Sequence, residues 1–147
     1  MTLFSKVFHD LGPRLLICAD QSGHIIEHLP ANPPFNAHTL AALAAANLAA
    51  AREMKLLSDI QMGDNDVDLL ITSTERGAIL AVQRRDELIF VAVTGPNTRI
   101  GIAKLLLVRL ARTYTREEAV QEDQRAKQTL FHRLMRGKGL DMDYNNR

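Results

Sequence analysis

The sequence predicts an α/β fold of the α+β kind, in which a five-stranded antiparallel sheet is combined with three helices. Residues 36–57 form a long stretch of high helix propensity without glycine or proline. Two almost wholly apolar runs, RLLICAD at 14–20 and LIFVAVT at 88–94, are typical of strands that are covered on both faces. Segments rich in turn residues separate the other short apolar runs, as in antiparallel hairpins.

Length and composition limit the classes of protein to consider. The chain has 147 residues, which corresponds to one domain large enough to bury a core, and its hydrophobic content of 46% is that of a globular protein. No apolar run approaches the ~18–20 residues of a membrane span, and the amphipathic N-terminus is too short for a secretory signal. The single cysteine cannot form an internal disulfide, which agrees with a reducing compartment. We therefore expect a cytoplasmic protein without a membrane span.

The first part of the chain is expected to form a helix and then a hairpin. Apolar residues at helical spacing over residues 3–11 precede Gly12 and Pro13, which end that helix. The strand at 14–20 leads into a turn at residues 20–23, where aspartate and glycine favour tight turning, and residues 24–29 return as the second strand. Prolines at 30, 33 and 34 exclude regular structure before the long helix.

The long helix, which Asn36 can cap by accepting hydrogen bonds from the first turn, is the element around which we expect the chain to be organised. One side is predicted to face the core, and at 3.6 residues per turn it gathers Leu40, Leu43, Ala44, Leu48, Ala51 and Met54. The opposite side predicts a subunit interface of small apolar residues: Ala42, Ala45, Ala46, Ala49 and Leu56. An alanine-rich helix buried within a monomer is the alternative. Asn47 interrupts the core stripe, where a buried amide either sets the helix registry or bonds to nearby backbone.

Residues 67–94 are expected to form a three-stranded meander. Residues 67–72 alternate as in a half-exposed strand, residues 78–84 form the fourth strand, and the apolar run 88–94 is the fifth. The two wholly apolar strands should be central neighbours, which gives the sheet order 2-1-5-4-3. The third strand then lies at an edge without lysine or proline, so that it can pair with a copy of itself. Its expected interface residues are Asp68, Leu70 and Thr72.

A last helix completes the domain, which is predicted to span residues 1–114. It begins near Pro96, and its buried side is expected to consist of Ile100, Ala103, Leu106, Leu107, Leu110 and Tyr114. A capping box at residues 115–118 and a thin apolar stripe predict a helical extension over residues 115–136, which could dock on the domain, pair across a dimer or bind a partner. Residues 137–147 are expected to form a flexible tail.

Charge is unevenly distributed along a chain whose formal net charge is +1. Residues 97–147 contain 11 Lys/Arg and 6 Asp/Glu, a local charge of +5, and the preceding residues carry −4. This asymmetry suggests that the C-terminal part meets an acidic surface, although a solvated helix face explains it nearly as well. Nucleic-acid binding is not favoured, because aromatic stacking residues are scarce and no known motif is present.

Residues that could carry chemistry are poorly spaced for it. His24 and His28 share a strand face but lie ~13 Å apart at the usual strand rise, too far to bind one metal ion. The only cysteine lies within a central strand and is expected to be a buried, inert thiol. Asp64, Asp66 and Asp68 lack the glycine and the downstream glutamate of an EF-hand loop. We expect no enzyme activity, no metal and no cofactor.

Three stretches of the chain resemble the roadblock/dynein light chain domain family. LLICADQSGHII is similar to that family's opening strand, Asp, turn, Gly and second strand, and LAALAAANLAAAREM is similar to its alanine-rich dimer helix. ELIFVAVTGPNTRIGIAKLLLVRLA resembles the closing strand and helix, with Gly101 matching a family glycine. The resemblance covers about residues 3–114, and among members of the family it points to the bacterial MglB-type regulators.

The resemblance implies a profilin-like arrangement, with the long helix on one face of the sheet and the N- and C-terminal helices on the other. It also implies a homodimer whose long helices lie antiparallel and whose third strands join the two sheets. Such proteins bind Ras-like small GTPases, and the MglB type stimulates GTP hydrolysis without a catalytic residue of its own. This chain likewise lacks a GxxxxGK[ST] phosphate loop. By analogy, the GTPase would dock across the paired long helices near His38, Arg52 and Glu53.

A PAS-like sensory domain that binds a small ligand is the main alternative, because it uses the same strand order. Such a sensor requires a hollow between the sheet and the helices. The alanine-rich helix is expected to pack too closely on the sheet to leave that room. A ligand-sized cavity at this place would therefore favour the sensor.

Overall fold

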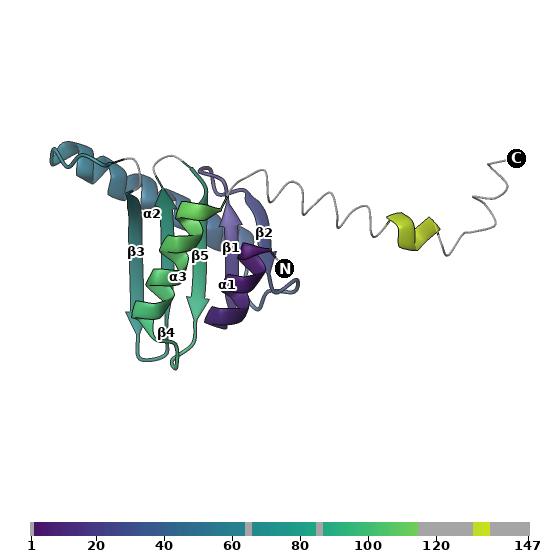
Figure 1. The fold of residues 1–147 in the computed structure, drawn as a ribbon. Coiled ribbons are helices and arrows are strands. Elements are labelled where there is room, and N and C mark those ends of the chain that lie inside the picture. Colours follow the sequence, from purple (N-terminus) through teal and green to yellow (C-terminus); the bar gives the residue numbers. More distant parts are fainter. Residues whose placement is uncertain (1, 64–65, 85–86, 115–130, 136–147) are drawn as a thin grey trace, which may run out of the picture. The chain divides into compact units, whose positions relative to one another are not determined.

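The structure, a computed structural model, describes residues 2–63, 66–84, 87–114 and 131–135 (Figure 1). The chain divides into two units, Met1–Tyr114 and Thr115–Arg147. In the second unit residues 131–135 are helical, and the rest of the expected extension and tail lies outside the described residues. The first unit contains α1 (Leu3–Leu11), β1 (Leu15–Ala19), β2 (Ile25–Leu29), α2 (Ala37–Leu57), β3 (Val67–Thr74), β4 (Gly77–Arg84), β5 (Ile89–Thr94) and α3 (Ile100–Thr113).

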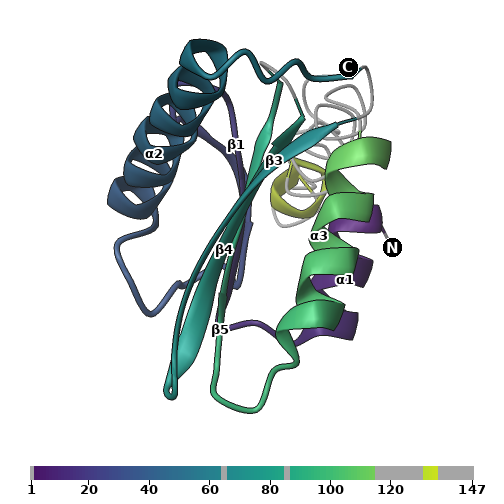
Figure 2. The same cartoon turned by 90° about the vertical axis from the view of Figure 1, so that its left-hand side faces the viewer.

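The five strands form one antiparallel sheet in the order β2-β1-β5-β4-β3, which confirms the predicted topology. Figure 2 shows α2 on one face of this sheet and α1 and α3 on the other, as expected. The two apolar runs are neighbours at the centre, where Ile17 of β1 pairs with Val91 of β5. Every residue of β1 is buried because helices cover both faces at this position.

The face of the sheet under α1 and α3 carries an aromatic cluster. The ring of Tyr114 meets those of Phe90 and Phe4 edge-on, with centroids 5.1 and 6.4 Å apart. The Tyr114 hydroxyl donates a hydrogen bond of 3.0 Å to a carboxylate oxygen of Glu27. Burial, with the neighbouring Glu27 carboxylate, raises the pKa of this hydroxyl far above its ordinary value. Cys18 is buried on the central strand, as expected.

The long helix α2 begins as predicted, with the side chain of Asn36 accepting a hydrogen bond of 3.1 Å from the Thr39 amide. Its core face differs from the expected one by a rotation of roughly 80° about the helix axis. Leu43 and Met54, both expected in the core, are exposed, and Asn47 is exposed rather than buried. The residues that pack on the sheet are mostly alanines: Ala37, Ala41, Ala44, Ala45 and Leu48.

The turn between β1 and β2 lies directly against the backbone of α2. Gly23 has a φ of +89°, and a Cβ atom built there would lie 2.8 Å from the Cα atom of Ala42. A carboxylate oxygen of Asp20 fixes the turn by accepting hydrogen bonds of 2.9 Å from the Ser22 and His24 amides. Glycine is needed at this position for both its backbone conformation and its lack of a side chain.

A comparison of two glycine substitutions tests this contact. Gly12 also has a positive φ, +62°, but a Cβ there would meet nothing within 4 Å. We expect Gly12→Ala to lower the free energy of unfolding by about 1–2 kcal/mol through backbone strain alone. Gly23→Ala should cost roughly twice as much, because the added methyl must also displace α2. Urea unfolding measures both, and equal losses would show that the turn does not hold the helix.

Candidate protein-interaction surface

The C-terminal end of α2 presents large apolar side chains to solvent. Figure 1 shows this end of the helix extending beyond the edge strand β3. Leu57 is 86% exposed and Met54 is 68% exposed, and Leu56 and Ile60 are also exposed. Covering such a side chain completely with another surface is favourable by roughly 1.5–3 kcal/mol. The end of α2 is therefore a candidate contact region.

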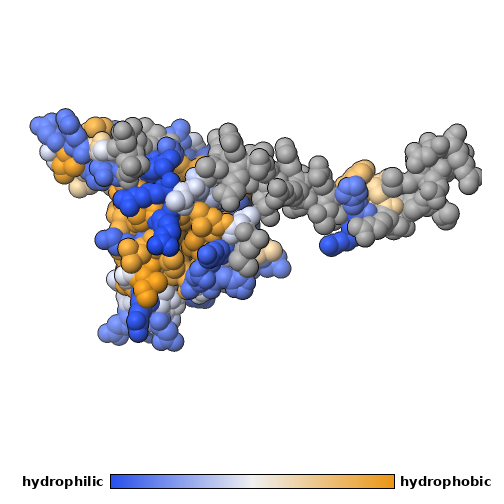
Figure 3. Space-filling view, viewed as in Figure 1, coloured by the Kyte–Doolittle hydropathy of each residue, from blue (hydrophilic) through white to orange (hydrophobic). Residues whose placement is uncertain are grey.

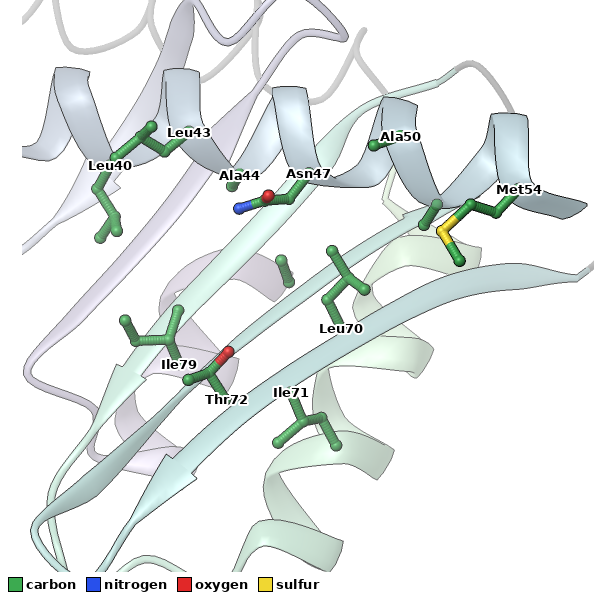
Figure 4. A pocket seen from close by; sticks show the side chains of 12 residues that line it. Leu40, Leu43, Ala44, Asn47, Ala50, Met54, Leu70, Ile71, Thr72 and Ile79 are labelled. Atoms are coloured by element: carbon green, nitrogen blue, oxygen red, sulfur yellow. The ribbon is translucent and has the colours of Figure 1, made fainter.

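An open apolar groove runs along one flank of α2, between the helix and the strands β3 and β4. Its volume is about 540 Å³, and Figure 4 shows the side chains that border it. Leu43 and Ile79 on its rim are both exposed, so the groove opens to solvent. Its lining comes from Leu40, Leu43, Ala44, Asn47, Ala50, Ala51 and Met54 of α2 and from Leu70, Ile71, Thr72, Ile79 and Ala81 of the strands.

A second hollow of about 290 Å³ continues the groove toward the start of α2. It shares Leu40, Leu43 and Ile79 with the groove and adds Phe35 and Val93. The guanidinium of Arg14 lies over the Phe35 ring, 4.6 Å from its centroid. We call the two hollows together the α2 groove.

Alanine side chains account for the volume of the α2 groove. Ala44, Ala50 and Ala51 on the helix and Ala81 on β4 end at a methyl group, so they leave space that larger side chains would fill. The helix nevertheless packs firmly on β1 and β5, where Ala41 and Leu48 are fully buried. The hollow therefore lies to one side of α2, over β4 and β3, rather than beneath the helix.

A polar cluster ties the C-terminal half of α2 to β3 and β4. The ammonium of Lys55 forms a salt bridge and hydrogen bond with the buried carboxylate of Asp68. The guanidinium of Arg52 lies 3.8 Å from the other carboxylate oxygen of Asp68 and donates a hydrogen bond of 2.6 Å to the side chain of Gln83. Gln83 in turn donates to the backbone oxygen of Glu87 at 2.8 Å. These bonds hold the helix in place beside the open groove.

The expected dimer-interface residues fall into two groups, one accessible and one buried within the chain. Leu70 and Thr72 line the α2 groove, and Ala46 is exposed on the outer side of the helix. Ala45 and Asp68 are buried within the chain, 8% and 1% exposed, so their side chains are not available to a second chain. Within this chain Ala45 belongs to the core face of α2, and Asp68 is turned toward Lys55, which differs from the exposed position expected for both residues.

The other expected interface residues, Ala42, Ala49 and Leu56, are exposed but point to a different flank of α2. At about 100° per residue, they lie on the side away from Leu43, Asn47 and Met54. The sequence pattern had placed those groove residues in the core. Their i, i+3, i+4 spacing around a polar Asn47 was the signal that could have identified a second apolar stripe on the helix.

The three candidate GTPase-binding residues do not form one cluster. His38 and Glu53 are exposed, but they lie roughly 22 Å apart along the helix axis. Arg52 points inward and bonds to Gln83, so its role is to position α2 rather than to present charge on the outer surface.

The strand β3 is an edge of the sheet, as predicted. In the part of the chain that the structure describes, it pairs only with β4, over Val67–Thr74. Its second half, from Ile71 to Thr74, is exposed. Backbone groups on its free side are available to another strand.

Chemical sites are not evident around this surface. Among the described residues, no three His, Cys, Asp or Glu side chains come together as metal ligands. No helix within the described ranges combines the length and the apolar composition that crossing a bilayer demands. The arrangement can bury apolar surface and bond a strand edge, which are functions of an interaction surface.

Comparisons with known proteins identify the fold. No protein-family model matches the sequence, and no curated protein matches it either. Among solved structures, the gliding protein MglB from Thermus thermophilus is similar with a TM-score of 0.63 and 24% identity, covering 81% of this chain and 87% of that one. An MglB with a tetrameric arrangement has a TM-score of 0.64 and 26% identity, covering 80% of this chain and 87% of that one.

A Roadblock/LC7 domain from Streptomyces avermitilis is similar as well, with a TM-score of 0.62 and 12% identity. The likeness covers 76% of this chain and 90% of that domain. Identities this low establish the architecture and not the activity. The chain therefore has a roadblock-type fold that is similar to the fold of MglB.

Proposed function

We propose that this protein is a homodimeric, non-catalytic regulator or scaffold that binds a Ras-like small GTPase in the cytoplasm. The observation that carries the proposal is the MglB-like fold combined with an open apolar groove beside α2. Stimulation of GTP hydrolysis is one form that the regulation can take. The sequence resemblance to MglB-type regulators is the reason for proposing a GTPase as the partner. The α2 groove is the reason for proposing a dimer.

The shape of the surface supports a two-fold dimer. In a two-fold interface the same patch serves both chains, so it must be complementary to itself. A two-fold axis beside β3 would bring the edge strands together and lay the projecting end of each α2 over the α2 groove of the other chain. Leu57 and Met54 would then fill the space that the alanines leave open.

In such a dimer the outer sides of the two α2 helices form one platform, where we place the GTPase. The exposed residues His38 and Glu53 lie on that platform, and Arg52 supports it from within. The protein would act by holding the switch segments of the GTPase in the conformation that hydrolyses GTP. This is a shift between existing states of the GTPase, and it requires no catalytic residue from this chain.

The dimer is tested by placing a charge in the α2 groove. Leu43→Glu and Met54→Glu should each convert the dimer into a monomer, because the carboxylate would be buried without a partner on association. Size-exclusion chromatography with light scattering measures the mass. A monomeric wild-type chain at high concentration would refute the dimer.

Ala42→Glu is the matched control, because Ala42 is exposed on the other flank of the same helix. It should leave the dimer intact. If Ala42→Glu separates the chains and Leu43→Glu does not, the interface lies on the flank that the sequence predicts, and the groove has another use.

The GTPase is tested with Ras-like GTPases from the same source organism, loaded with either GDP or a non-hydrolysable GTP analogue. Pull-down with the full chain should retain the GTP form preferentially, because only that form orders the switch segments. Glu53→Lys should weaken this binding by about tenfold, whereas Glu75→Lys in the β3–β4 turn should not change it.

Single-turnover hydrolysis then separates activation from scaffolding. A faster rate with wild type, and not with Glu53→Lys, identifies an activator. Equal binding of the GDP-bound and GTP-bound forms would indicate a scaffold. If the chain binds no Ras-like GTPase of the organism, the proposed partner is wrong.

The volume of the α2 groove favours the alternative function, a sensory domain that binds a small ligand. Its volume of about 540 Å³ is in the range of small-molecule sites, contrary to the expectation that α2 would leave no room. Its rim residues are exposed, however, whereas a ligand pocket encloses most of its ligand. A monomeric chain that binds a small apolar ligand would favour the sensor.

A further inference from the structure

A second apolar surface lies on α3, on the opposite face of the sheet from the α2 groove (Figure 2). Leu105 is 69% exposed, Ile102 is 48% exposed and Ile100 is 36% exposed. At about 100° per residue, Leu105 lies almost opposite the centre of the buried side of α3, with Ile102 next to it. The most exposed apolar side chain therefore stands on the crest of the helix, on a convex surface. We call Ile102 and Leu105 the α3 crest; Ile100, in the first turn, lies about 140° from Leu105 around the helix and is not part of it.

All charged side chains of α3 are positive. Lys104 and Arg109 lie on either side of Leu105, and Arg99 precedes the first turn. The helix contains no aspartate or glutamate. Within the described ranges, no hydrogen bond or ion pair joins the side chains of these three cations to another residue. Figure 3 shows hydrophobic and hydrophilic residues side by side on this face of the first unit.

This combination selects among possible partners by chemistry. A second copy of the chain would bring like charges together, which opposes association through this face. A helical peptide partner usually enters a groove, whereas the α3 crest is convex. Aliphatic side chains at a crest with lysine and arginine beside them are typical of helices that lie on membrane surfaces, where apolar groups enter the headgroup region and cations meet lipid phosphates.

We propose that the α3 crest binds an anionic lipid surface, with Leu105 and Ile102 entering the interface and Arg99, Lys104 and Arg109 contacting headgroup phosphates. Each cation near an anionic membrane strengthens binding about fivefold, so three cations and two aliphatic side chains give reversible, peripheral attachment. The proposal concerns the face opposite the α2 groove and does not depend on the dimer or on the GTPase.

The test is co-sedimentation of the full chain with large vesicles. One set is pure phosphatidylcholine, and the other contains about one-third phosphatidylglycerol. We expect sedimentation with the anionic vesicles, little with the neutral ones, and release at high salt because the headgroup contacts are screened. The absence of sedimentation with anionic vesicles at low salt overturns the proposal and points to an acidic protein as the partner of this face.

Two pairs of variants locate the contact. Lys104→Glu should weaken vesicle binding by about tenfold or more, whereas Arg76→Glu, the same change of charge in the exposed β3–β4 turn, should have less than a twofold effect. Leu105→Ser should weaken binding by about fivefold or more, whereas Leu134→Ser, an exposed leucine in the second unit, should not. Thermal unfolding confirms that each variant is folded, since all four positions are exposed.

Two patterns contradict the proposal. If Leu134→Ser abolishes binding and Leu105→Ser does not, the lipid contact belongs to the second unit rather than to α3. If Lys104→Glu weakens binding and Leu105→Ser has no effect, the attraction is purely electrostatic and no side chain enters the interface, so an acidic protein surface fits this face equally well.

Discussion

The packing of α2 on β1 and β5 through alanine side chains is the contact on which the other features of the molecule depend. Ala41 is fully buried there, and the turn at Gly23 approaches the same stretch of helix backbone so closely that a side chain would collide with it. Short side chains bring the helix close to the central strands. The same short side chains leave an open groove on the flank toward β4 and β3. Alanine at these positions therefore accounts both for the close packing of α2 on the central strands and for the open groove beside the helix.

The polar cluster of Lys55, Arg52, Asp68 and Gln83 complements that packing. Where α2 leaves the centre of the sheet, apolar contacts become fewer and charged hydrogen bonds continue the attachment. A buried carboxylate between two cations favours one position of the helix relative to β3. The end of α2, beyond this cluster, carries the exposed side chains of Leu56 and Leu57. A helix end with apolar side chains beside an apolar groove is suited to association with a copy of itself.

The two faces of the sheet differ in the kind of surface that they expose. On the α2 side the exposed groups are mainly apolar and line a concave groove, which suits a protein surface of matching shape. On the α3 side the apolar groups stand on a convex crest between cations. The opposite placement follows from the sheet, since helices packed on its two faces direct their outer sides away from each other. The fold thus separates the two proposed contact surfaces, so that binding at one does not block the other.

The sequence by itself determined the elements, their order and the topology of the sheet. Continuous apolar runs identified the central strands, and glycine, proline and aspartate marked the turns, because these signals depend on local chemistry. The rotation of α2 about its axis was decided only by the tertiary structure. Alanine is compatible with a core, a tight helix contact or solvent, so an alanine-rich helix carries almost no information about which side is buried. The sheet, the Gly23 turn and the Asp68 carboxylate fix that rotation, and they buried Ala45 and exposed Leu43, contrary to the prediction.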